Sequence, residues 1–332
     1  MNINWEPITL DLKTTFRIAH GASEQRHNVL VHLEEGIGEG AGVDYLGESQ
    51  DRIIEYLDSA AEQLKDDPIQ IEALLESLPQ GSSSGRAALD IALHDLWGKR
   101  QGVPLHQLLG IPLQQLPSTS FTIAMDQPEK MAQNAKRSGW PIIKIKLGSA
   151  DDEAIVRAIR EKTEAAIRVD ANAGWTREQA ATLIPRLVEY GLELVEQPLA
   201  AGDVEGLRWL RAHNLGVKIF ADESIRTPQD VIDHANVVDG VVIKLMKSGG
   251  IRSAMRMIEI ARSFDMQIML SCMVESSVGV TAAAHMAPLC EYIDLDGPLL
   301  IKNDPYEGVI YRGAKLVLPD GPGLGVIKRK RN

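Results

Sequence analysis

Short apolar runs alternate with amphipathic stretches through most of the chain after residue 118. The runs are PIIKIKLG, AAIRVD, LELVEQP, VKIFADE, GVVIKLMKSGG, QIMLSCMVES and EYIDLDGP. Between them lie segments such as DEAIVRAIREKTE and GIRSAMRMIEIARSF, whose apolar residues recur at helical spacing. Strands and helices therefore alternate to about residue 296, giving eight strands if FTIAM at 121–125 is the first. This alternation predicts an α/β fold of the (β/α) barrel type.

Polar residues stand at the end of each apolar run. Asp170, Glu196 and Asp222 follow one another at intervals of 26 residues, about the length of one strand, one loop and one helix. The series continues in both directions at similar intervals, with Lys144, Lys146, Lys244, Ser271 and Asp294. All of these side chains are expected at the carboxyl ends of parallel strands, where barrel enzymes carry their active sites.

The first 112 residues have a different pattern. A β-like segment, NVLVHLEEGIGEGAGV, is followed by three helical stretches, which predicts an α+β domain ahead of the barrel. We expect domains at residues 1–112 and 113–300, followed by a C-terminal segment at 301–332. Two polar segments that contain glycine, at 17–25 and 42–48, could be lids that close over a site or ordinary turns.

Composition narrows the class of protein. The 332 residues contain no run of about 18 apolar residues, and the N-terminus lacks a basic start followed by an apolar stretch. Cys272 and Cys290 are the two cysteines and show no metal-binding spacing, so we expect a cytoplasmic protein. The net charge of −11 argues against nucleic acid and anionic membranes as partners.

Three carboxylates that converge without histidine or cysteine form an oxygen-only site. Such a site suits Mg²⁺, or alternatively Mn²⁺, better than Zn²⁺. Acidic residues after strands also serve as helix caps, and that is the alternative interpretation of Asp170, Glu196 and Asp222. The three residues recur at one interval, and lysines continue the same series on either side of them. This regular spacing favours the metal site.

The lysines indicate proton transfer. A cation held by carboxylates can bind a substrate carboxylate and stabilise the charge that develops when the adjacent carbon loses its proton. Lys146 on the second strand and Lys244 on the sixth would approach one carbon from opposite sides, which predicts racemisation or epimerisation. Lys144 points the same way as Lys146 and would act as a base or tune its neighbour. Alternatively, these lysines are only salt-bridge partners of the carboxylates.

The strings KIK, VDANAGW, VEQP, ADES and IKLMKSGG resemble, in this order and spacing, the enolase superfamily, in the subgroup that contains muconate lactonising enzymes. The resemblance spans nearly the whole chain. It implies a (β/α)7β barrel and a capping domain built from the N-terminal region and the C-terminal tail. It also implies that Asp170, Glu196 and Asp222 bind Mg²⁺, that Lys146 and Lys244 are the acid–base pair, and that the two lid segments close over the substrate. Barrels of this family commonly assemble into homo-oligomers.

Members of this subgroup perform cycloisomerisation, dehydration to o-succinylbenzoate, N-acylamino acid racemisation or dipeptide epimerisation. The string DLDGP, with Asp294 and Asp296 on one side of the eighth strand, resembles the DxD motif by which dipeptide epimerases bind a free α-amino group. The sequence thus predicts a Mg²⁺-dependent epimerase that inverts the C-terminal residue of an L,L-dipeptide. The alternatives are an N-acylamino acid racemase, an o-succinylbenzoate synthase, or a catalytically silent metal-binding barrel.

Side-chain preference is the least defined feature. Relatives that act on Ala-Glu dipeptides often carry an arginine in the first lid, where this chain reads IAHGASEQR. Glu275 could favour a cationic or polar side chain, or could cap the next helix, and Met273 could form an adaptable apolar wall. We expect the substrates to be either L-Ala-L-Xaa dipeptides or a broad range of L,L-dipeptides. The candidate substrate contacts, besides Asp294 and Asp296, are His20, Ser23, Arg26, Ser271, Met273 and Glu275.

Overall fold

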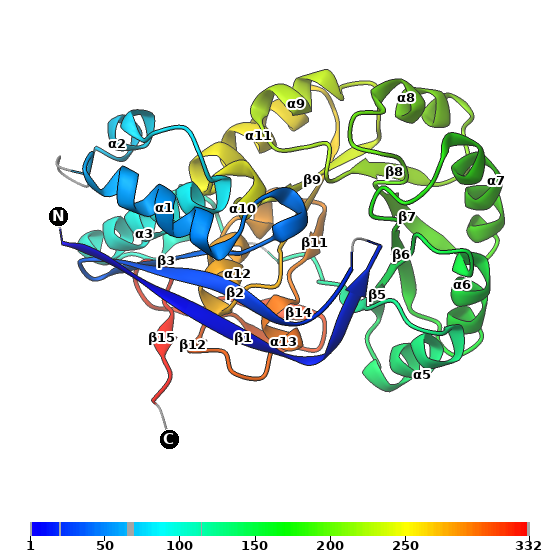
Figure 1. The fold of residues 1–332 in the computed structure, drawn as a ribbon, viewed down its shortest axis with the longest axis horizontal. Coiled ribbons are helices and arrows are strands. Elements are labelled where there is room, and N and C mark those ends of the chain that lie inside the picture. The colour runs from blue at the N-terminus through cyan, green and yellow to red at the C-terminus, as the bar shows by residue number, and fades with distance from the viewer. Residues whose placement is uncertain (1, 20, 65–69, 114, 331–332) are drawn as a thin grey trace.

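Eight parallel strands form a closed barrel in the computed structural model, which describes residues 2–19, 21–64, 70–113 and 115–330 (Figure 1). The strands are β4 (Phe121–Ile123), β5 (Ile142–Lys146), β6 (Ala166–Asp170), β7 (Leu192–Glu196), β8 (Lys218–Ala221), β9 (Gly240–Lys244), β10 (Gln267–Ser271) and β11 (Tyr292–Asp294). Each strand pairs with the next in the chain. A parallel bridge between Thr119 and Ile293 joins the first strand to the last. The predicted eight-stranded barrel, with its first strand at FTIAM, is confirmed.

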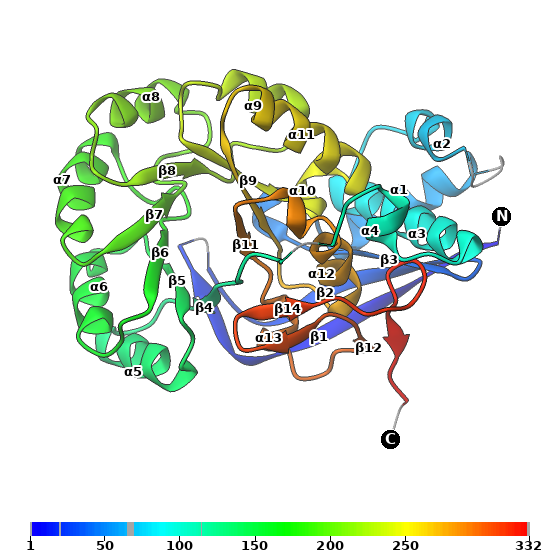
Figure 2. The same ribbon diagram turned by 180° about the vertical axis from the view of Figure 1, so that it is seen from behind.

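Helices cover the outside of the barrel and connect successive strands (Figure 2). They are α5 (Pro128–Ser138), α6 (Asp152–Arg160), α7 (Arg177–Val188), α8 (Val204–Ala212), α9 (Pro228–Asp233), α10 (Leu245–Ser248), α11 (Ile251–Ser263) and α12 (Ser277–Ala284). The sequence specifies several helix starts locally. Thr176 and Gln179 form a capping box at the start of α7, and Thr227 and Asp230 form another at α9.

The strand residues alternate between two buried environments. In β5, Ile143 and Ile145 pack in the main hydrophobic core, whereas Lys144 and Lys146 point to the barrel mouth. Deeper in the barrel, Leu194, Phe220, Val242 and Met269 form a separate apolar cluster, to which four adjacent strands each contribute one residue. This cluster fills the interior below the polar end, so the barrel is a packed core with one functional face.

An antiparallel sheet and three helices precede the barrel. The sheet consists of β1 (Ile3–Ile18), β2 (Gly21–Leu33) and β3 (Gly36–Gly40), and α1 (Gln50–Ala61), α2 (Ile71–Ser77) and α3 (Ser83–Gln101) pack beside it. Glycine is required where β3 crosses α3, because a Cβ at Gly38 would lie 2.0 Å from the carbonyl oxygen of Ala88. The short helix α4 (Leu105–Leu108) leads to the barrel.

The hairpin of β1 and β2 is long and reaches from this sheet to the barrel mouth (Figure 1). Arg17 and Ile18 still belong to β1, and residues 21–25 belong to β2, so most of the first predicted lid segment is strand rather than loop. The main-chain amide of Met125 donates to the carbonyl oxygen of Arg17 at 3.0 Å, which docks the hairpin tip on the barrel. The second lid segment contains a single 3₁₀ turn, Asp44–Leu46.

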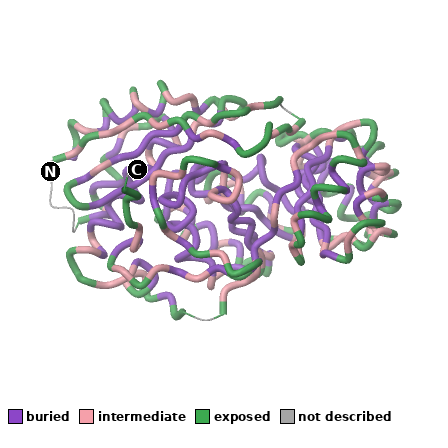
Figure 3. The backbone as a smooth tube through the Cα atoms, turned by 90° about the horizontal axis from the view of Figure 1, so that it is seen from below, coloured by how far each residue is buried: buried purple, intermediate pink, exposed green. Residues whose placement is uncertain are grey.

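The C-terminal segment returns to the N-terminal region. It follows α13 (Gly297–Leu300) and contains β12 (Tyr306–Glu307), β13 (Ile310–Arg312), β14 (Lys315–Val317) and β15 (Ile327–Lys328). The buried Asp95 of α3 accepts from the amides of Ile37 and Leu324, at 2.8 and 2.7 Å, and so ties this segment to β3. Figure 3 shows buried residues in the interior of the molecule and exposed residues along its outer edges. Among the described residues, no helix has the length and apolar character needed to span a bilayer.

Candidate active site

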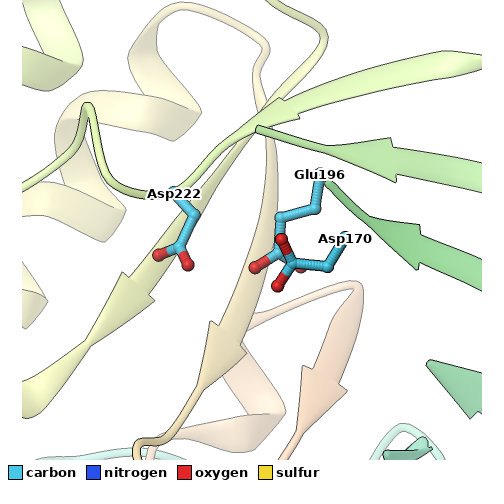
Figure 4. Close-up of side chains that lie close together, drawn as sticks. All are labelled: Asp170, Glu196 and Asp222. Carbon is cyan, nitrogen blue, oxygen red and sulfur yellow. The ribbon is translucent and has the colours of Figure 1, made fainter. Parts of the chain in front are cut away.

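Three carboxylates converge at the carboxyl ends of neighbouring strands (Figure 4). Asp170 and Glu196 are the last residues of β6 and β7 and are paired in register, and Asp222 follows β8 directly. One oxygen from each residue lies within 4.8 Å of the others, and all three side chains are buried. The structure therefore brings together the three residues that the 26-residue interval singled out.

Lysines surround this cluster on two sides. The Nζ atom of Lys146 lies 2.6 Å from Oδ2 of Asp170, and that of Lys244 lies 2.6 Å from Oδ2 of Asp222. Because β6, β7 and β8 lie between β5 and β9, the two ammonium groups approach the carboxylates from opposite sides. The separation of Lys146 and Lys244 that the sequence predicts is thus present in the structure.

Lys144 is the most enclosed of the three lysines. Its Nζ atom lies 2.7 Å from Oε2 of Glu196, 3.2 Å from Oδ2 of Asp170 and 2.9 Å from Oδ2 of Asp294. It therefore connects the three-carboxylate cluster to the aspartates of the eighth strand. A group held by three carboxylates has little freedom to move toward a substrate, which favours a role in tuning charge over a role as the base.

The mutual charges determine the ionisation of these groups. Burial opposes the charged form of Lys144, but Asp294 and Glu196 outweigh it and raise the pKa of that lysine. Burial lowers the pKa of Lys244 and the charge of Asp222 raises it. The charge has the larger effect, so the pKa of Lys244 is also raised. A lysine held in the ammonium form cannot accept a proton. Binding of a divalent cation to the same carboxylate oxygens would remove this stabilisation and allow the pKa of Lys244 to fall.

Asp294 and Asp296 lie at the same end of the barrel. Asp294 accepts hydrogen bonds from Ser120 Oγ at 2.6 Å and from Ser271 Oγ at 3.1 Å, in addition to its contact with Lys144. Asp296 accepts from the amide of Thr122 at 2.7 Å. Burial and the charge of Asp294 raise the pKa of Asp296 to about 7. A cation placed between the two carboxylates would relieve their repulsion.

A cavity joins these groups to the two lid segments. Lys146, Lys244 and Asp296 line its floor, and Phe16, Ile18 and Arg26 of the hairpin form part of its cover. Val43 and Tyr45 of the second lid complete the cover. Both segments that were predicted as possible lids therefore lie over the polar end of the barrel. The first of them is the tip of a hairpin.

The remaining candidate substrate contacts are spread over different environments. Met273 lines the cavity, whereas Ser23 lines a wider cleft that shares Arg26 and Tyr45 with the cavity. Glu275 is buried and accepts from the amide of Met273 at 2.7 Å, and burial together with Glu39 raises its pKa to about 8. A carboxyl group that is neutral near pH 7 offers no charge to a cationic side chain. His20 lies outside the described residues.

Three further polar residues beside the carboxylates were not assigned a role from the sequence. Asn172 donates from Nδ2 to Oε1 of Glu223 at 3.3 Å, and Lys247 contacts Asp222. Among the described residues, Oδ1 of Asn172 and Oε2 of Glu223 are buried without a hydrogen-bond partner. The sequence contained a signal for them, because each of these residues lies one to three positions after a polar residue at the end of a predicted strand. Anionic oxygens with unpartnered oxygen acceptors beside them fit a hard divalent cation.

Comparison with known families agrees with this geometry. Residues 128–330 match the family described as enolase C-terminal domain-like, and residues 6–110 match the N-terminal domain of the mandelate racemase / muconate lactonizing enzyme family. The chain belongs to the mandelate racemase / muconate lactonizing enzyme family of the enolase superfamily. The resemblance inferred from the sequence motifs is therefore confirmed.

Several family members are similar over nearly their whole length. The L-Ala-D/L-Glu epimerase of Bacteroides thetaiotaomicron is 35% identical, with 99% of this chain and 88% of the relative covered. The dipeptide epimerase of Enterococcus faecalis, solved with Mg and L-Leu-L-Tyr, is 34% identical at a TM-score of 0.92, with 98% of each chain covered. The N-succinyl Arg/Lys racemase of Bacillus cereus is 28% identical at a TM-score of 0.94, with 98% and 95% covered.

Mg²⁺ should stabilise this chain through the carboxylate cluster. A ligand at about 100 times its dissociation constant adds roughly 2.7 kcal/mol to the free energy of unfolding, so the Tm should rise by several degrees. Differential scanning fluorimetry with MgCl₂ measures the shift. Glu196→Gln should abolish it, whereas Glu205→Gln, on the exposed face of α8, should not. An undiminished shift in Glu196→Gln would place the bound ion elsewhere.

Proposed function

We propose that this protein is a Mg²⁺-dependent dipeptide epimerase, with Mn²⁺ as an alternative ion, that inverts the α-carbon of the C-terminal residue of an L,L-dipeptide. The observation that carries the proposal is the placement of Lys146 and Lys244 on opposite sides of one carboxylate cluster, facing a cavity that also contains Asp296. We further propose that residues 1–112 and 301–332 act together as the cap of a barrel formed by 113–300.

One end of the substrate would be fixed by its carboxylate. Asp170, Glu196 and Asp222 would hold the cation, which when bound supplies a positive charge that stabilises the carbanion formed by loss of the α-proton. The buried, covered setting strengthens that interaction because little water screens it. The α-carbon would then lie between the two lysines, so that Lys146 addresses one face and Lys244 the other.

The other end of the substrate would be fixed by its ammonium group. Asp294 and Asp296 present two carboxyl groups to the same end of the barrel, and Asp296 lines the cavity. A free α-amino group satisfies them by charge-assisted hydrogen bonds, whereas an N-succinyl group would add negative charge beside them. This argument favours a dipeptide over an N-acylamino acid as the substrate, and therefore epimerisation over N-acylamino acid racemisation.

Deuterium uptake tests the reaction class. When pooled L,L-dipeptides are incubated with the protein and Mg²⁺ in D₂O, the dipeptides that are substrates should each gain one deuterium, as measured by mass spectrometry, and EDTA should suppress the gain. Deuterium only in a parallel pool of N-succinyl amino acids would overturn the dipeptide reading. No uptake in either pool would overturn racemisation and epimerisation together.

Lysine variants test the two-base assignment in the same assay. Lys146→Ala and Lys244→Ala should each lose net epimerisation by at least about a hundredfold, because one face of the α-carbon then lacks its acid or base. Each variant should still exchange the α-proton of one stereoisomer, and the two variants should prefer opposite stereoisomers. Normal epimerisation by either variant, or the same stereoisomer in both, would contradict the assignment.

The aspartates generate a prediction with a pH signature. Replacing Asp294 and Asp296 by Asn should raise KM for free dipeptides at least about tenfold, because charge-assisted hydrogen bonds are lost, and should affect N-acetylated substrates much less. Because the pKa of Asp296 is raised to about 7, Asp296 is protonated below that pH. In the wild type, kcat/KM for free dipeptides should therefore fall as the pH drops below 7, and Asp296→Asn alone should flatten this limb. Equal losses for both substrate types would leave these residues only a structural role.

Arg26 supports a preference within the dipeptides. The guanidinium of this half-buried residue lies 5.8 Å from the centre of the Phe16 ring, and burial lowers its pKa. The charges of Tyr45 and Asp44 in the second lid act in the opposite direction but do not outweigh burial. A partly desolvated cation that lines the cavity favours a substrate with an acidic side chain.

Substitution of Arg26 tests this preference directly. Arg26→Leu should lower kcat/KM for L-Ala-L-Glu relative to L-Ala-L-Leu by about tenfold or more, because the charged contact is lost and the apolar wall is kept. Lys13→Leu, which removes an exposed cation of the same hairpin that does not line the cavity, is the matched control and should leave the ratio unchanged. An unchanged ratio in Arg26→Leu would show that the guanidinium does not contact the substrate side chain.

A further inference from the structure

Lys247 lies behind the carboxylate cluster, on the short helix α10 that follows β9. It is buried, and its Nζ atom donates to both the main-chain carbonyl oxygen and Oδ1 of Asp222. A third, longer contact of 3.3 Å reaches the carbonyl oxygen of Val242. Lys244 occupies the other oxygen of the same carboxylate, Oδ2. Two ammonium groups thus share one carboxylate, with one group on each oxygen.

The two lysines differ in what surrounds them. Lys244 lines the substrate cavity, whereas Lys247 lines a small separate cavity beneath the second lid, together with Val43 and Leu46. Lys247 is therefore placed to act on Asp222, while Lys244 is placed to act on substrate. Two of its three acceptor atoms belong to Asp222, just after β8, and the third belongs to Val242 in the middle of β9, so Lys247 also links the end of β8 to β9.

The N-terminal region holds the helix that carries Lys247. Asp90 of α3 accepts from the amide of Ile251 at 2.8 Å, just after α10 ends at two glycines with positive φ. On the opposite side, Sδ of Met246 accepts from the amide of Ala41 at 3.3 Å. Ala41 immediately precedes the second lid segment. The position of Lys247 is thus set by contacts with both the barrel and the N-terminal sheet.

We propose that Lys247 is a positioning residue that holds Oδ1 of Asp222 and so directs Oδ2 at the cation, an inference that rests on the metal site of the proposed function. A free carboxylate can rotate about its last bond and exchange its oxygens, and a hydrogen bond to one oxygen removes that freedom. Outer partners of this kind commonly affect metal affinity by about 10–100-fold. Asp222 then offers one defined oxygen to the cation.

The proposal predicts whether metal affinity rises or falls when Lys247 is removed. An ammonium group beside a carboxylate also repels a divalent cation, so a lysine that acted only through its charge would weaken metal binding. Removal of such a lysine would raise the affinity. Removal of a lysine that holds the ligand in place should instead lower it. Lys244 competes for Oδ2 itself, so its removal should raise the affinity.

Mn²⁺ binding to the full-length protein, measured by electron paramagnetic resonance of the free ion, separates these cases. Lys247→Met should lower Mn²⁺ affinity by about tenfold or more, and Lys244→Met should raise it. Lys218→Met removes an exposed lysine that donates to Tyr292 at the start of β11, and it should leave the Mn²⁺ affinity unchanged. Mg²⁺ competition repeats the measurement with the proposed physiological ion.

The outcomes distinguish the two levels of the proposal. If the wild type binds Mn²⁺ and Lys247→Met binds it equally or more tightly, the positioning role is wrong and the proposed function stands. If the wild type binds no Mn²⁺, the metal site itself fails. Circular dichroism checks folding, and Lys247→Leu, which also removes the donor, serves if Lys247→Met does not fold. Its affinity should fall below that of the wild type, and an equal or higher affinity would overturn the proposal.

Discussion

The mutual neutralisation of buried charges at the barrel mouth is the constraint on which the structure depends. Asp170, Glu196 and Asp222 are almost completely removed from water, and an isolated buried carboxylate costs several kcal/mol. Lysines from neighbouring strands compensate them within 2.6–3.2 Å. Such a cluster persists only if every member is held in place, so the strands that carry these residues must be rigid. The same requirement suits an active site in which charge has to be redistributed during the reaction.

The barrel supplies that rigidity from below. Leu194, Phe220, Val242 and Met269 fill its interior, and Tyr292 packs edge-on against Phe220 with ring centres 5.5 Å apart. Because this layer is packed, the strand ends above it cannot move independently. The parallel register between β6 and β7 then fixes the separation of Asp170 and Glu196. Packing in the apolar layer therefore determines the distances between the side chains of the polar layer.

The cover over the site is built on different principles. The hairpin and the second lid contribute Phe16, Arg26 and Tyr45 to the cavity, and none of these residues belongs to a barrel strand. In the proposed function, the rigid barrel would carry the proton-transfer lysines, and the attached region would contact the substrate side chain. The chains similar to this one are named as epimerases and as a racemase of different substrates. Lys247 lies where the two parts meet.

The sequence by itself determined the barrel and the positions of its functional strand ends. The 26-residue interval from Asp170 to Asp222 reflects one strand, loop and helix, and the helix starts are encoded by local capping residues such as Thr176. Side-chain direction within a strand follows from its twofold period, so the inward orientation of Lys144 and Lys146 was also predictable.

Tertiary structure decided how these residues meet and what covers them. The contact of Lys144 with Asp294 joins residues 150 positions apart and depends on closure of the barrel. Glu275 and Lys247 lie beyond the strand ends, where no periodicity fixes the direction of a side chain, and packing turned Glu275 toward Glu39 and Lys247 toward Asp222. Arg26 reaches the cavity only because a 13-residue strand carries the hairpin across to the barrel. Periodic local structure is readable along the chain, whereas contacts between distant segments are set by how the whole chain packs.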